Sequence, residues 1–209
     1  MLKEPGTITV KTGSMRSGKS GELIEDINAH KRAKMKVLVV KPAQDTRDGD
    51  QIIAKEVIDG KPTNIKLPVD ANFVSSRRDI MRLIKKTHCE VFAADEVQFF
   101  GRWFIKLVQE LAFERKMIVL LAGLDLDAWR KPFGIMPEIL AHATYVDKCQ
   151  ASCFVCGRPA QFTQKLGGDP TKTVEPGDHY EARCFRCHVM PEDLMAESLG
   201  ASIIKASTV

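Results

Sequence analysis

Residues 13–20 read Gly13-Ser14-Met15-Arg16-Ser17-Gly18-Lys19-Ser20, the G-x-x-x-x-G-K-S pattern of a phosphate-binding loop. The pattern directly follows Thr7–Val10, whose alternating residues are typical of a strand. Glycines let backbone N–H groups surround phosphate oxygens at the start of a helix. In such loops the lysine contacts the β- and γ-phosphates, and the serine hydroxyl binds Mg²⁺. The stretch therefore predicts a site for a Mg-bound nucleoside triphosphate, in which Lys19 and Ser20 have these two roles.

The composition of the 209 residues is that of an ordinary globular protein with one core and room for a small appendage. No run of about 20 apolar residues is present, and no charged-then-apolar leader is visible at the start. We therefore expect a cytoplasmic protein without a membrane partner. The net charge of +4 is small and basic residues are mixed with acidic ones, which gives no reason to expect a nucleic-acid partner.

Four of the six cysteines form two C-x-x-C pairs, Cys153 with Cys156 and Cys184 with Cys187. Such paired knuckles supply the four thiolates of a tetrahedral zinc site. A closed site of this kind leaves no position for a substrate, so the zinc is expected to be structural, and His188 is not needed as a ligand. The other two cysteines, Cys89 and Cys149, are expected to be small buried side chains.

Apolar and amphipathic stretches alternate from Thr7 to Tyr145 in the manner of an α/β protein. The expected strands are Thr7–Val10, Lys36–Val40, Cys89–Ala94 and Met117–Ala122. The expected helices are Gly21–Lys34, Arg77–Lys86 and Trp103–Arg115. The last three strands are almost entirely apolar, which favours a parallel sheet covered by helices on both faces.

Changes in composition along the chain divide it into three parts. Residues 1–148 are expected to form the nucleotide-binding domain, 149–191 a small zinc-binding domain, and 192–209 a C-terminal helix and tail. Within the first part, residues 41–72 are polar and rich in Pro, Asp and Gly. We expect this stretch to be a mobile excursion from the core with short β-like pieces such as Gln51–Ile53.

A second motif complements the phosphate loop. The apolar strand Val91–Ala94 runs straight into Asp95 and Glu96. In phosphate-loop enzymes a carboxylate at a neighbouring strand end binds Mg²⁺, which predicts this role for Asp95. Glu96 is then available as a general base for the group that attacks the γ-phosphorus.

The chain resembles the cellular-type, or type II, thymidine kinases, which join a phosphate-loop core to a zinc-bearing lasso domain. The motifs that carry the resemblance occur in the family's order over most of the chain. They are Gly13–Ser20, Lys41-Pro42 with Asp45-Thr46-Arg47, Asp95–Phe100, Gly123-Leu124-Asp125, Lys131–Gly134, Cys153–Cys156, Phe162-Thr163, Tyr180 and Cys184–Cys187. The resemblance implies an α/β fold with a RecA-like parallel sheet flanked by helices, together with a small zinc-binding lasso domain.

The resemblance also implies the reaction, which is ATP-dependent phosphorylation of thymidine at the 5′-hydroxyl to give dTMP, a step of nucleotide salvage for DNA synthesis. Glu96 would take the proton of the 5′-hydroxyl, and a homotetramer is expected. The residues that would bind ATP and Mg²⁺ are Gly13, Ser14, Met15, Arg16, Ser17, Gly18, Lys19, Ser20, Asp45 and Asp95. The residues that would enclose thymidine are Met15, Gln98, Phe99, Leu124, Phe133, Thr163 and Tyr180.

Alternative functions remain open at the level of sequence. Glu175 and Pro176 stand where the family has Gly-Gly ahead of the base-contacting tyrosine. Because proline fixes φ and lacks an N–H, the specificity loop must follow another path, which is compatible with a deoxynucleoside kinase of altered base specificity. A phosphate loop with a zinc ribbon also fits an ATPase acting with nucleic acid, or a nucleotide-binding regulatory protein without turnover.

Overall fold

A six-stranded sheet lies at the centre of the molecule, in the order β5-β2-β6-β7-β1-β8, and every neighbouring pair is parallel. The computed structural model describes residues 2–45, 49–58, 61–167 and 179–191. The strands of the sheet are β1 (Ile8–Gly13), β2 (Val37–Pro42), β5 (Asn72–Val74), β6 (Val91–Ala94), β7 (Ile118–Gly123) and β8 (Tyr145–Cys149). Predictions for Thr46, Arg47, Glu175, Pro176 and residues 192–209 lie outside the described residues.

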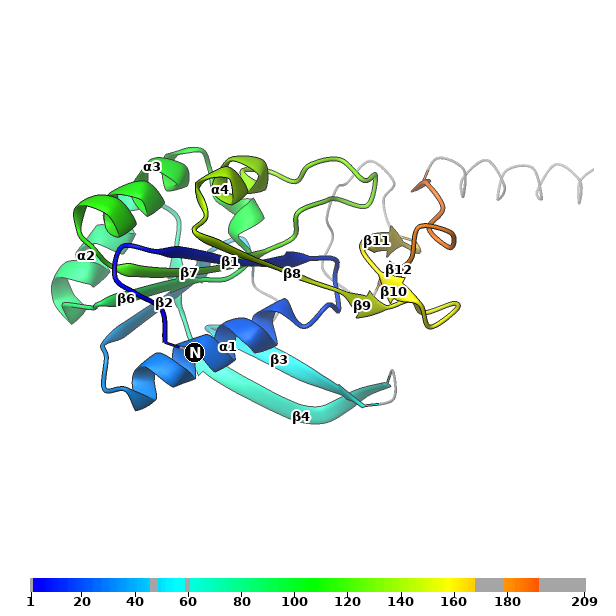
Figure 1. Ribbon diagram of the computed structural model, residues 1–209, viewed down its shortest axis with the longest axis horizontal. Helices are drawn as coiled ribbons and strands as arrows, with labels where there is room; N and C mark the ends of the chain where they lie inside the picture. The colour runs from blue at the N-terminus through cyan, green and yellow to red at the C-terminus, as the bar shows by residue number, and fades with distance from the viewer. Residues whose placement is uncertain (1, 46–48, 59–60, 168–178, 192–209) are drawn as a thin grey trace, which may run out of the picture.

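Helices cover both faces of this sheet (Figure 1). One face carries α1 (Lys19–Arg32), and the other carries α2 (Arg77–Thr87), α3 (Trp103–Gln109) and α4 (Met136–His142). The side chains of β7 alternate between the two sides: Val119 and Leu121 pack with α2, α3 and α4, whereas Ile118 and Leu120 pack with α1. This double burial explains the continuous apolar strands and confirms the predicted α/β fold.

Most predicted elements of the core are confirmed, with shifts at their ends. β1 continues to Gly13 instead of ending at Val10, because its ladder with β7 runs on to the pair Thr12 and Gly123. α3 continues as a π-helical turn, so helical structure extends to Glu114. The edge strands β5 and β8 were not predicted, since the first has three residues and the second mixes polar and exposed side chains.

Residues 51–70 form an antiparallel hairpin of β3 (Gln51–Ile58) and β4 (Lys61–Asp70). Ile52 pairs with Val69, and both are buried in the cluster that contains Leu23 and Ile27 of α1. The predicted excursion from the core is therefore wrong for this part, because two apolar side chains fix the hairpin to α1. The polar composition of the stretch hid this contact.

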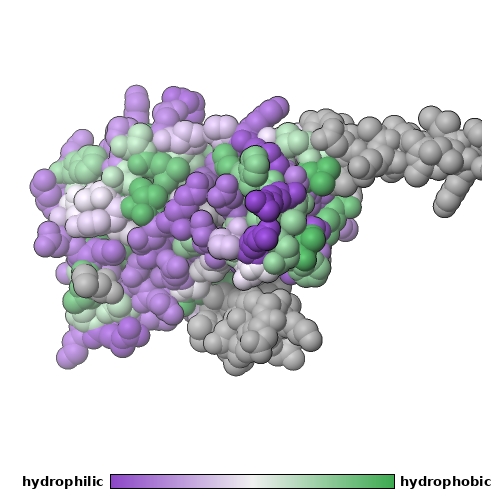
Figure 2. Space-filling view, turned by 45° about the vertical axis from the view of Figure 1, so that its right-hand side comes forward, coloured by the Kyte–Doolittle hydropathy of each residue, from purple (hydrophilic) through white to green (hydrophobic). Residues whose placement is uncertain are grey.

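A small module follows β8 beyond the carboxyl end of the sheet (Figure 1). It contains β9 (Ala151–Ser152), β10 (Pro159–Ala160), β11 (Phe162–Lys165) and β12 (Tyr180–Arg183), paired as two antiparallel hairpins. Phe154 and Phe185 are 63% and 69% exposed, and Figure 2 shows apolar residues at the surface of this end of the molecule. The buried cluster inside the module consists of Cys153, Ala160, Ala182 and Cys184. Such a small core needs a second source of stability.

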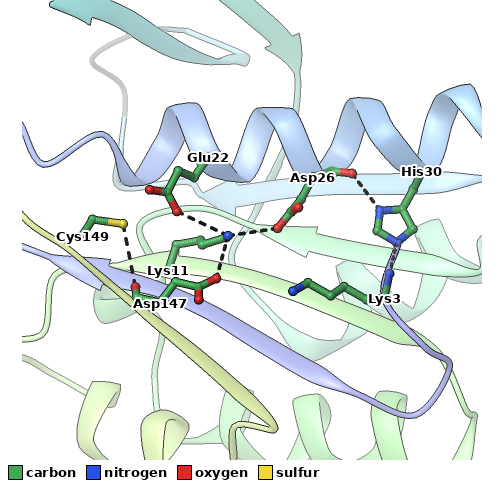
Figure 3. A network of polar contacts seen from close by, with 7 residues as sticks. All are labelled: Lys3, Lys11, Glu22, Asp26, His30, Asp147 and Cys149. Carbon is green, nitrogen blue, oxygen red and sulfur yellow. Dashed lines mark hydrogen bonds and ion pairs between the residues drawn. The ribbon is translucent and has the colours of Figure 1, made fainter. Parts of the chain in front are cut away.

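A buried lysine joins the three elements around the phosphate loop (Figure 3). Lys11 on β1 lies 2.7 Å from Asp147 of β8 and 3.2 and 3.3 Å from Asp26 and Glu22 of α1. Burial alone would lower the pKa of Lys11, but the hydrogen bond to Asp147 and the charge of Asp26 outweigh it and raise the pKa. The Lys11 hydrogen bond lowers the pKa of Asp147. Two residues separate Lys11 from Ser14, so this network fixes the entry into the loop.

Replacement of Lys11 by methionine is expected to destabilise the fold by about 2 kcal/mol, because Asp26 stays buried without its cation. Because folding lowers the pKa of Asp147, this carboxylate stabilises the folded state fully above its unfolded pKa of 3.8. The stabilisation is lost as the pH falls through the lower pKa of the folded state. The raised pKa of Lys11 keeps its contribution intact below 10.5. Urea unfolding followed by tryptophan fluorescence should therefore give a deficit that is constant at neutral pH and shrinks in acid. Lys31→Met, at an exposed position of α1, is the control and should cause no deficit.

Candidate active site

The carboxyl ends of parallel strands meet at one edge of the sheet, and the predicted site residues lie along this edge. The phosphate loop follows β1, Asp45 lies beyond β2, Asp95 follows β6, and Leu124 follows β7. Because β6, β7 and β1 are neighbours in the sheet, the loop and the carboxylates are brought to the same place. Ligands of open parallel sheets bind at this edge.

The phosphate loop has the backbone that its glycines allow. Gly13 has φ +137°, and a Cβ added to it would lie 2.2 Å from the carbonyl oxygen of Cys149. Only glycine lets the loop pass so close to the end of β8. Lys19 Nζ donates to the backbone oxygen of Ser14 at 2.7 Å. Burial lowers the pKa of Lys19, and the nearby charges of Glu96 and Asp95 oppose this shift.

The start of α1 and the end of β6 are joined by one hydrogen bond. Ser20 Oγ donates to Asp95 Oδ2 at 2.9 Å, and the other Asp95 oxygen accepts from the N–H of Glu96 at 2.8 Å. Burial, with the charge of Glu96 adding to it, raises the pKa of Asp95 to about 7. A hydroxyl beside a buried carboxylate, with a second carboxylate next to it, is a donor set that fits Mg²⁺.

A cavity of about 170 Å³ opens beside this pair. Its lining residues come from the start of α1, the ends of β2 and β6 and the hairpin: Ser20, Lys41, Asp45, Gln51, Ile52, Ile53, Asp95 and Glu96. Lys41, which is 2% exposed, pairs with Asp45 at 3.2 Å and donates to the backbone oxygen of Gln51 at 3.2 Å. The hairpin therefore closes one side of the cavity, and Asp45 is held in its wall.

Glu96 has a left-handed backbone, with φ +53°, and precedes the short 3-10 turn η1 (Val97–Phe99). The amide nitrogen of Gln98 donates to its carboxylate, and the amide oxygen of Gln98 accepts from the N–H of Leu124 at 3.0 Å. These partners determine which way the amide points, because a carboxylate only accepts and an N–H only donates. Gln98 thus connects Glu96, the predicted general base, with Leu124, which follows the carboxyl end of β7.

The residues predicted to enclose a nucleoside form pairs in the structure. The rings of Phe99 and Phe133 meet edge to face at 5.6 Å, and Gly134 allows this approach, since a Cβ there would lie 2.2 Å from the carbonyl oxygen of Gln98. The N–H of Met15 donates to Thr163 Oγ1 at 3.0 Å, which joins the phosphate loop to the small module. Tyr180 is buried on β12, the strand that pairs with β11.

Sequence reasoning missed the contact between Arg130 and His188. The Arg130 guanidinium donates to His188 Nδ1 at 3.1 Å and to the His188 backbone oxygen at 3.0 Å. Burial, followed by the charge of Arg130, lowers the pKa of His188. The residue follows a cysteine of the second knuckle but points away to other partners, in agreement with its predicted exclusion from the ligand set. The sequence offers no signal for this pairing, because 58 positions separate the two residues.

The four cysteines of the two knuckles, Cys153, Cys156, Cys184 and Cys187, come together, and their sulfur atoms all lie within 4.8 Å of one another. Across the knuckles, Cys156 Sγ lies 3.6 Å from Cys184 Sγ. Zinc bound to four thiolates at about 2.3 Å sets the sulfur atoms about 3.8 Å apart, so the arrangement fits zinc. Cys89 and Cys149 are buried elsewhere, as predicted.

A parallel α/β sheet with a phosphate loop at its carboxyl edge and an Asp-Glu pair beside it defines a nucleotide-binding enzyme of the phosphate-loop class. The sequence model of the family described as thymidine kinase matches residues 6–188. The chain therefore belongs to the thymidine kinase family, and it is a kinase that phosphorylates thymidine. Within the described residues, no helix combines the length and apolar character required to cross a bilayer.

The cysteine cluster predicts about one zinc per chain by elemental analysis of the purified protein. Cys156→Ser should reduce the zinc content to less than half, because three thiolates do not close a tetrahedral site. Cys89→Ala is the matched control and should keep full zinc, since Cys89 lies in the main core. Full zinc content in Cys156→Ser would contradict the assignment.

Proposed function

We propose that the protein transfers the γ-phosphoryl group of ATP to the 5′-hydroxyl of thymidine and so produces dTMP for nucleotide salvage. One observation carries the proposal: Asp95 and Glu96 are adjacent and line the same cavity, but their side chains have different partners. Asp95 accepts from Ser20 of the phosphate loop, whereas Glu96 is held by Gln98, which also binds the β7 end. Asp95 thus serves the phosphoryl donor, and its neighbour Glu96 serves the phosphoryl acceptor.

On the donor side, the residues proposed to hold ATP are Gly13, Ser14, Met15, Arg16, Ser17, Gly18, Lys19 and Ser20, with Asp45 and Asp95 on the metal side. The loop N–H groups and the start of α1 favour negative charge. Lys19 would exchange its hydrogen bond to the Ser14 carbonyl for an ion pair with the phosphates. This exchange is favourable because burial disfavours the charged ammonium, and the negative phosphates offset that cost. Mg²⁺ held by Ser20 and Asp95 would neutralise charge on the phosphate oxygens.

On the acceptor side, a nucleobase requires apolar and aromatic walls with a few polar groups. Phe99 and Phe133 supply an edge-to-face aromatic pair, and Leu124 supplies an aliphatic wall that is 7% exposed. Met15, Thr163 and Tyr180 are proposed to complete the pocket, with Gln98 at its base. Enclosure by these residues would keep water from accepting the phosphoryl group.

The reaction proposed is a single in-line transfer. The 5′-oxygen forms a bond to the γ-phosphorus as the bond to the β,γ-bridging oxygen breaks, and the 5′-hydroxyl proton passes to the Glu96 carboxylate. The left-handed backbone and the Gln98 amide fix the carboxylate before the substrate arrives. The homotetramer and the three-part domain division stay predictions.

Thymidine should stimulate ADP release strongly, because no acceptor hydroxyl is present without it. The measurement is coupled ADP release with ATP and Mg²⁺, comparing thymidine, deoxyuridine and the other deoxynucleosides with single-stranded DNA. Glu96→Gln should lower kcat by about 10² to 10⁴ and leave ATP affinity unchanged, since it removes only the base. Glu25→Gln, at an exposed position of α1, is the control.

The comparison separates the candidate functions. Release stimulated by DNA and indifferent to every nucleoside would replace the kinase proposal with a nucleic-acid-dependent ATPase. Preference for a nucleoside other than thymidine would identify a kinase of altered base specificity. Full activity in Glu96→Gln would show that Glu96 is not the general base.

A further inference from the structure

Residues 125–133 form a tight loop whose shape is fixed by its own backbone. Leu126 bridges Pro132, and the N–H of Phe133 donates to the Asp125 oxygen at 2.9 Å. At the tip, one Asp127 carboxylate oxygen accepts from the backbone N–H groups of residues 129 and 131, at 2.8 and 2.9 Å. Because the loop holds its own conformation, movement of the tip is transmitted to its base.

Arg130 occupies the tip in a strained conformation and is held there by the small module. Its φ of +58° is uncommon for a side-chain-bearing residue and persists only where surrounding contacts support it. The guanidinium makes both hydrogen bonds to His188 described above and lies 4.7 Å from the centre of the Phe162 ring. Phe185 lies on the same group, at 5.5 Å.

His188 passes this contact on to the phosphate loop. A guanidinium can only donate, so His188 Nδ1 accepts and the ring proton resides on Nε2. Nε2 then donates to the backbone oxygen of Thr163 at 3.3 Å, and Thr163 Oγ1 accepts from the Met15 N–H at 3.0 Å. A chain of polar contacts therefore links Arg130, through β11, to Met15, which is one of the residues proposed to enclose thymidine.

The base of the same tight loop carries the proposed acceptor walls, since Leu124 and Phe133 flank its two ends. We propose that Arg130 is a positioning residue for thymidine: it fixes the 124–134 segment to the second cysteine knuckle and so sets the width of the acceptor pocket without touching substrate. This inference rests on the proposed function, because it assigns a consequence to the same pocket.

Arg130→Met should raise the KM for thymidine about tenfold, the effect expected from losing charge-assisted hydrogen bonds that hold a pocket wall. The variant retains a long side chain at the same φ, so it removes the guanidinium and little else. The kcat at saturating thymidine, the KM for ATP and the zinc content should stay within about twofold of wild type, because the donor machinery and the four thiolates are unaltered. Arg130→Lys, which keeps one donor group and the charge, should give a smaller rise.

Arg186→Gln is the matched control, since Arg186 is exposed on the same knuckle, and its kinetics should equal those of wild type. An unchanged thymidine KM in Arg130→Met, in an active wild-type background, would overturn this inference alone. Loss of zinc, or an equal rise in both KM values, would overturn it in favour of a general structural role. A wild-type protein that does not phosphorylate thymidine would instead overturn the proposed function.

Discussion

The hydrogen bond between Ser20 and Asp95 is the constraint on which the rest of the site depends. Ser20 lies in the first turn of α1, which follows β1, and Asp95 follows β6, so β7 lies between the two strands that lead to them. They meet because the strands of the six-stranded sheet are all parallel, so the loop after β1 and the residue after β6 reach the same edge, where Gly13 passes against the Cys149 carbonyl. Asp95 is paired with Ser20 at the start of α1, and the next residue, Glu96, is held by Gln98. In the proposed function, this arrangement places the groups for the phosphoryl donor and for the acceptor next to each other.

The small module contributes contacts rather than a core of its own. Among the residues that the structure describes, its hydrophobic cluster consists of small side chains, so a metal bound by the four thiolates would add stability that this small core does not supply. Hydrogen bonds from Met15 to Thr163 and from Arg130 to His188 attach it to the carboxyl edge of the sheet. A structural metal can thus affect substrate binding although its closed coordination excludes it from the chemistry.

Local patterns in the sequence predicted the phosphate loop, the Asp95-Glu96 pair and the cysteine knuckles, because each is a short motif whose chemistry requires those residue types. The strands β2, β6 and β7 were predictable from their double burial. The hairpin β3–β4 was not, because its apolar residues alternate with charged residues and prolines in a stretch whose composition is typical of a loop. The contacts of Lys11, Gln98 and Arg130 join segments far apart in sequence, so no local pattern encodes them.

The proposed reaction transfers the phosphoryl group directly from ATP to thymidine, with no intermediate bound covalently to the protein. The configuration at phosphorus tests it most directly, using ATP made chiral at the γ-phosphorus with isotopic and sulfur labels and thymidine as acceptor. A single in-line displacement predicts inversion at phosphorus in the dTMP product. Retention would contradict the account, because it requires a covalent phospho-enzyme and hence two displacements.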